Sequence, residues 1–99
     1  MTLTSKQRAH LRGLSHSLKP TAHVGKDGVT PAVVRSLLET FQQHELVKVR
    51  VLENAPDSAK SLAHEIAEKL AGAHVVQTMG RNVTLYRPDP EEPTIALPR

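Results

Sequence analysis

The sequence predicts a single α/β domain, in which helices and a sheet pack as an α+β sandwich in the order α-β-α-β-α-β-β. Two kinds of hydrophobic pattern predict this class. Three segments repeat apolar residues at helical spacing, and four shorter segments are β-branched or alternate apolar with polar residues. The length of 99 residues is that of one domain and allows a modest hydrophobic core.

The first helix is expected over residues 5–16, with an apolar stripe toward the core and a basic outer surface. Three leucines are expected to form that stripe: Leu11, Leu14 and Leu18. Pro20 cannot continue a helix, so a short strand is expected at residues 21–24.

The second helix is expected from Pro31 to about His44, because Thr30 is a good N-cap residue and proline fits the first helical position. A strand follows at residues 46–52. Apolar and basic residues alternate along it, which predicts one buried face and one polar face. The alternating residues are Val47, Lys48, Val49, Arg50 and Val51.

A third helix is expected from residue 57 or 58 to residue 70, with Gly72 at its C-terminal cap. Two strands at residues 74–79 and 83–87 are joined across Gly80-Arg81-Asn82, a sequence typical of a hairpin turn. The prolines and acidic residues after Arg87 do not favour regular structure. We therefore expect a domain at residues 1–88 and a tail at residues 89–99.

The tetrapeptide Gly25-Lys26-Asp27-Gly28 lies between the first strand and the second helix. Glycine accepts positive φ and allows close approach of a partner, and the first turn of a helix leaves N–H groups unpaired. With Lys26 beside them, these groups predict an anion site, and a side chain added at Gly28 is expected to project toward the bound anion. The alternative is a tight strand-to-helix turn without a ligand.

The positive charge is concentrated in the half of the chain that contains this tetrapeptide. Residues 1–50 hold eight Lys and Arg against three Asp and Glu, a charge of +5, whereas residues 51–99 hold five against seven, a charge of −2. This asymmetry favours a polyanion as partner. We expect five residues to form one continuous basic surface with the glycine loop: Lys6, Arg8, Arg12, Lys19 and Lys26.

The sequence offers no pattern typical of an enzyme or of a metal site. There is no cysteine, and His64-Glu65 begins like a zinc helix but lacks the second histidine four residues after the first. Neither a nucleophile elbow nor a phosphate-binding Walker lysine is present. The start of the chain carries no apolar run of signal-peptide or membrane-spanning length. We therefore expect a cytoplasmic protein without cofactor, metal or membrane contact.

Several short motifs follow one another along the chain: Leu3–Arg8, Leu11–Leu14, Leu18–Pro20, Val24–Thr30, His44–Val49, Gly80, Leu85–Pro88 and Ile95–Arg99. In this order they resemble the CRM domain, the chloroplast RNA splicing and ribosome maturation module, in its single-domain bacterial form, the YhbY family. The resemblance implies a four-stranded mixed sheet with three helices, similar to the C-terminal domain of translation initiation factor three. It also implies an RNA-binding role on precursors of the large ribosomal subunit. We expect the protein to be a monomer.

The resemblance further implies that the GxxG loop contacts the RNA backbone, as the similar loop of KH domains does. Asp27 departs from this role, because its negative charge either weakens phosphate binding or caps the following helix. The candidate RNA-binding residues are Gly25, Lys26, Asp27, Gly28, Lys6, Arg8, Arg12, Lys19, Lys48, Arg50, Arg81 and Arg87. The alternative function is a protein-interaction module whose basic patch docks an acidic protein.

Overall fold

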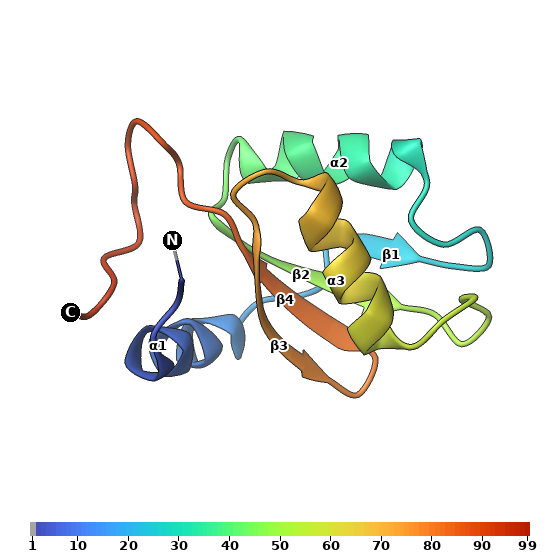
Figure 1. Ribbon diagram of the computed structural model, residues 1–99, viewed down its shortest axis with the longest axis horizontal. Coiled ribbons are helices and arrows are strands. Elements are labelled where there is room, and N and C mark those ends of the chain that lie inside the picture. Colours follow the sequence, from blue (N-terminus) through green and yellow to red (C-terminus); the bar gives the residue numbers. More distant parts are fainter. Residues whose placement is uncertain (1) are drawn as a thin grey trace.

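The computed structural model describes residues 2–99, and these residues contain the predicted elements in the predicted order (Figure 1). The helices and strands are α1 (Ser5–Ser15), β1 (Ala22–Val24), α2 (Pro31–Phe41), β2 (Leu46–Val51), α3 (Ala59–Lys69), β3 (His74–Met79) and β4 (Asn82–Tyr86). The fold prediction is confirmed. Helix α2 ends three residues earlier than expected, since the amide of Gln43 donates to Thr40 O in a tighter turn.

The four strands form one mixed sheet in the order β1-β2-β4-β3. Strand β2 runs parallel to β1 and antiparallel to β4, which is antiparallel to β3. Helix α2 provides the crossover that two parallel strands require. Helices α2 and α3 cover one face of the sheet and α1 packs on the other (Figure 1).

The main core lies between the sheet and helices α2 and α3. The predicted alternation of β2 is confirmed, because Val47, Val49 and Val51 are at most 2% exposed and pack with Leu37 of α2 and Ile66 of α3. Each side chain of this kind contributes about 1.5–3 kcal/mol when fully buried. The main core therefore fixes which face of β2 is turned away from the helices.

A second, smaller core lies under α1 on the opposite face of the sheet. Leu11 is fully buried there against Leu46, Val76 and Tyr86. The prediction that Leu14 also faces this core is wrong, since its side chain is 40% exposed. Ser15 takes the buried position one turn after Leu11, and its hydroxyl donates to Arg12 O at 2.8 Å.

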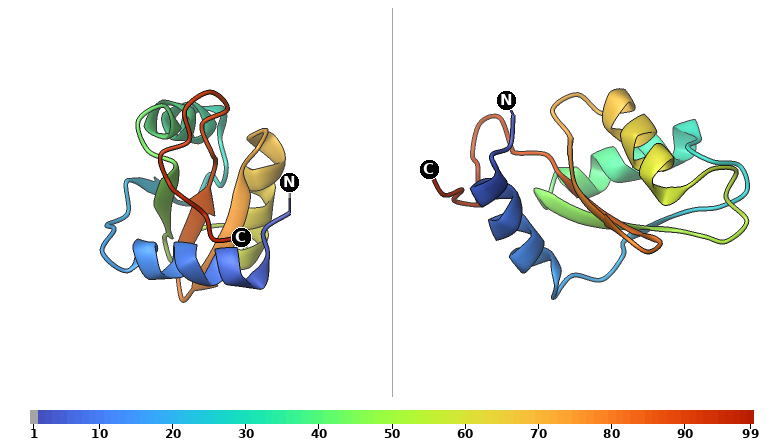
Figure 2. Two further views of the ribbon diagram at one scale, coloured as in Figure 1. Left: turned by 90° about the vertical axis from the view of Figure 1, so that its left-hand side faces the viewer. Right: turned by 60° about the horizontal axis from the view of Figure 1, so that its bottom comes forward.

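The C-terminal segment has no helix or strand, as predicted, but it packs against α1 (Figure 2). Ile95 and Leu97 contact the smaller core, and Gln7 Nε2 donates to Pro98 O at 3.1 Å. The segment is also held by Glu45, which lies between α2 and β2 and is only 5% exposed. Residues 89–99 are thus attached to the domain at several points.

The Glu45 carboxylate is the main polar attachment of this segment. It accepts hydrogen bonds from Asp89 N at 2.6 Å and from Thr94 N, Thr94 Oγ1 and Ile95 N, each at 2.7 Å. Burial by itself raises the pKa of Glu45, but these hydrogen bonds outweigh it and hold the pKa below its ordinary value. The folded protein therefore favours the charged carboxylate of Glu45 over its protonated form.

Replacing Glu45 by glutamine should lower the free energy of unfolding by about 1–3 kcal/mol, because the new amide group cannot accept from donors on both sides. Urea denaturation at neutral pH measures this. Glu39→Gln is the matched control, since Glu39 is exposed on α2 and its loss should change stability by less than about 0.5 kcal/mol.

The stability difference between the parent and Glu45→Gln should also depend on pH. Because folding lowers the pKa of Glu45, its contribution is complete above the ordinary value of 4.5 and is lost as the pH falls through the folded value. Denaturation from pH 7 down to pH 3 should show the two proteins converging. A difference that stays constant over this range would contradict the assigned role of the charge.

Candidate nucleic-acid interface

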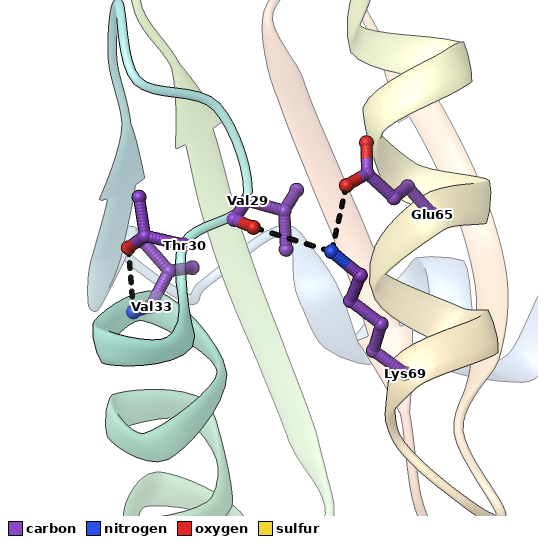
Figure 3. A network of polar contacts seen from close by, with 5 residues as sticks. All are labelled: Val29, Thr30, Val33, Glu65 and Lys69. Atoms are coloured by element: carbon purple, nitrogen blue, oxygen red, sulfur yellow. Dashed lines mark hydrogen bonds and ion pairs between the residues drawn. The ribbon is translucent and has the colours of Figure 1, made fainter.

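The GxxG loop, residues 25–28, follows β1 at one end of the sheet and leads into α2 (Figure 1). The amide of Gly28 donates to Gly25 O at 3.0 Å, which closes a tight turn, and the amide of Thr30 donates to Gly28 O at 3.1 Å. Thr30 then caps α2 through its hydroxyl, which accepts from Val33 N at 3.2 Å (Figure 3). The loop is thus ordered by its own hydrogen bonds.

The two glycines of this loop have different structural roles. Gly28 is buried, has φ of +69°, and a Cβ at this position would lie 3.2 Å from Pro56 Cγ. A Cβ on Gly25 would make ordinary contacts, 3.6 Å from Leu52 Cδ1 and 3.7 Å from Asn54 Oδ1. The prediction that a side chain at Gly28 would project toward a bound anion is therefore wrong, because it would point at Pro56.

Lys26 and Asp27 form the exposed tip of the loop. Among residues 2–99, neither of their amides donates a hydrogen bond. The Asp27 carboxylate likewise accepts none within the described chain, and α2 is capped by Thr30. Of the two effects expected for Asp27, capping of the following helix is thus wrong. The loop tip presents two free N–H groups, one cation and one anion.

Strands β1 and β2 carry basic residues on the face of the sheet opposite α2 and α3. Arg50 is exposed and pairs across with His23, and Lys48 is half-buried beside Thr21, whose amide donates to Lys48 O. Lys19 lies before the start of β1 and Lys26 lies after its end, so the two residues flank the strand that pairs with β2. Arg81 lies at the same end as Arg50, since Arg81 O accepts from Val51 N at 2.7 Å. We call these positions the basic strip: Lys19, Lys48, Arg50, Lys26 and Arg81.

The prediction of one continuous basic surface that joins α1 to the GxxG loop is wrong. Figure 1 shows α1 at the opposite end of the sheet from residues 25–28. The reason is topological, because α1 is joined to the start of β1 whereas the loop follows its end. Lys6 and Arg12 therefore belong to a separate group of cations on α1.

Two of the candidate arginines bind main-chain carbonyl groups of the domain itself. Arg8 Nη1 donates to Val75 O and to Val76 O, at the irregularity where β3 shifts register. Arg87 Nε donates to Ala71 O at 2.8 Å, just beyond the end of α3. These side chains attach α1 to β3, and the C-terminus of β4 to the turn that follows α3.

Sequence reasoning did not select His23, which the register places beside Arg50 on the basic strip's face. Strand alternation would have predicted the exposed position of His23, since Ala22 and Val24 are the buried neighbours.

His74 has a structural environment, because its ring stacks on Tyr86 and burial lowers its pKa, which favours the neutral form. Across residues 2–99, no three His, Asp or Glu side chains are grouped so as to hold a metal ion.

None of the described helices is long and apolar enough to cross a bilayer.

The sequence model of the CRS1 / YhbY (CRM) domain matches residues 3–87, which is most of the chain. The chain belongs to the CRM domain family.

Relatives of similar length match nearly the whole chain. The chain is 35% identical over 96 residues to a Bacillus subtilis protein named probable RNA-binding protein YqeI, covering 97% of this chain and 99% of the relative. It is 37% identical over 98 residues to a Haemophilus influenzae protein named RNA-binding protein, covering 99% and 97%. The solution structure of a Staphylococcus aureus protein superposes with a TM-score of 0.82 at 35% identity, covering 98% of this chain and 100% of that one.

Because the two glycines of this CRM domain differ in conformation, replacing each by alanine should have different effects on stability. Gly28→Ala should lower the free energy of unfolding by about 1–2 kcal/mol, since a left-handed backbone is unfavourable with a Cβ. Gly25→Ala is the matched control and should cost less than half as much. Urea denaturation measures both. Equal losses for the two variants would contradict the conclusion that only Gly28 needs the backbone conformation that glycine allows.

Proposed function

We propose that this CRM-family protein binds RNA with the GxxG loop and the basic strip. The observation that carries the proposal is the register of β1 with β2, which places Lys48 and Arg50 along the strands that lead to the loop, whose two tip amides are unpaired. Unpaired N–H groups and neighbouring cations are the groups that bind phosphate oxygens. The names of the Bacillus and Haemophilus relatives support RNA as the polyanion.

Recognition in this proposal relies on phosphate position and backbone shape more than on base stacking. The chain has one Phe and one Tyr, and both are core residues: Phe41 is 4% exposed and Tyr86 is 2% exposed. Stacking platforms for single strands need aromatic rings at the surface. Asp27 at the loop tip limits phosphate binding there, so Lys26 and Arg50 are expected to supply most of the attraction.

The finer proposal is that the RNA is a precursor of the large ribosomal subunit and that the protein acts in ribosome assembly, as a monomer in the cytoplasm. It is supported by the resemblance of the motifs to the YhbY family and by the matched relatives of the same length. The competing proposal is that the basic strip docks an acidic protein, since such a partner would also be attracted by this charge.

Each cation that contacts phosphate should contribute to the salt dependence of binding. Lys26→Ala and Arg50→Ala should each reduce the slope of log affinity against log salt by roughly 0.7–0.9, because one fewer counterion is released. Titration on a structured ribosomal RNA fragment measures the slopes. Lys60→Ala is the matched control, since Lys60 is exposed on α3, across the sheet from the strip. Unchanged slopes for both loop and strip variants would contradict the proposed surface.

Sedimentation of a cell lysate separates the RNA proposal from the acidic-protein alternative. We expect the protein to move with particles of the large subunit and to leave them after ribonuclease treatment, because the RNA holds it there. Lys26→Ala combined with Arg50→Ala should be depleted from the particles, and Lys60→Ala should not. Continued association with a particle protein after the RNA has been digested would favour a protein partner instead.

A further inference from the structure

A pocket of about 460 Å³ lies between α2 and α3, on the side of the domain away from the basic strip. Its lining consists of Pro31, Val34, Arg35 and Leu38 from α2 and Lys69 from α3. The Leu38 side chain is 38% exposed here. The pocket is therefore an apolar hollow with two cations at its rim, within the size range of small-ligand sites.

The structure fixes this pocket relative to the GxxG loop. Lys69 Nζ donates to Val29 O at 3.3 Å and to Glu65 Oε2 at 2.9 Å, so α3 is tied to the segment that leads from Gly28 into α2 (Figure 3). Pro31, which lines the pocket, is only three residues beyond Gly28. The pocket therefore lies beside the segment that leads from the loop into α2.

The lining of the pocket suits a flat, weakly polar ring with a negatively charged group attached to it. Val34 and Leu38 offer aliphatic surface, and the Arg35 side chain is exposed and donates no hydrogen bond among residues 2–99. A free guanidinium plane stacks on nucleobases as aromatic rings do. Since Phe41 and Tyr86 are buried, this pocket offers an aliphatic substitute for the missing aromatic platform.

We propose that the pocket between α2 and α3 takes one unpaired nucleobase of an RNA whose backbone lies on the GxxG loop, with the Arg35 guanidinium stacked over the base. The inference rests on the proposed function and adds that the RNA has an unpaired nucleotide next to the phosphates bound by the loop. A nucleotide matches both features of the site, because its base fills the apolar hollow and its phosphate lies beside the cations that line it.

The test uses two RNA duplexes that differ by a single bulged adenosine. The parent protein should bind the bulged duplex about fivefold more tightly, the lower end of the effect of one stacked base. Leu38→Gln should abolish this preference without changing affinity for the fully paired duplex, because it removes apolar surface and no charge. Leu14→Gln on α1 is the matched control, being 40% exposed, and should keep the preference.

A second variant tests the stacking by Arg35 and guards against an effect of Leu38→Gln on folding. Arg35→Lys keeps the charge but lacks the planar group, so the preference for the bulge should fall while the salt slope stays the same. A fluorescent 2-aminopurine at the bulged position should change its emission when the parent binds. The change should be smaller with either pocket variant.

The outcomes are distinguishable from those of the proposed function. Equal affinity of the parent for the two duplexes would overturn the base pocket while leaving RNA binding by the loop and strip intact. A preference that survives both Leu38→Gln and Arg35→Lys would place the base elsewhere and overturn the assignment. No binding of the parent to either duplex would contradict the proposed function, and the inference with it.

Discussion

Strand β2 has to hide Val47, Val49 and Val51 from water, and the arrangement of the rest of the molecule depends on this constraint. Because side chains alternate along a strand, the two basic residues between the valines must face the opposite side. Helices α2 and α3 cover the valine face, and the parallel pairing of β2 with β1 requires α2 as a crossover. The GxxG loop consequently lies at the end of β1, in line with the exposed cations.

The conformational need for glycine and a binding role of the loop are compatible. Gly28 permits the tight turn, and the cap of Thr30 on α2 holds the segment that follows it. A loop that is already ordered loses little freedom when a ligand binds, so its free amides act without a large entropic cost. The glycine that permits this turn thus also fixes the position of Lys26 and Asp27 at the loop tip.

The sequence was sufficient for features that depend on near neighbours. Thr30 and Pro31 predicted the start of α2, and the alternation of β2 predicted its buried face, since caps and strand periodicity are local. Contacts between distant segments leave no such pattern. Arg8 binds carbonyl groups of β3 more than sixty residues away, and Glu45 binds the C-terminal segment.

The sequence also failed to predict that the candidate cations form two separate groups. The cause is the same, because the position of one segment beside a distant one leaves no local pattern. Chain order does not give distance in space, so α1 was expected beside the loop but lies at the other end of the sheet. The longest dimension of the molecule is 39 Å, on the order of one turn of a nucleic-acid duplex. A ligand that contacts both groups of cations must carry negative charge at both ends of the sheet. An RNA backbone does so by its covalent structure, whereas a protein would need acidic side chains matched to both ends and to the basic strip between them.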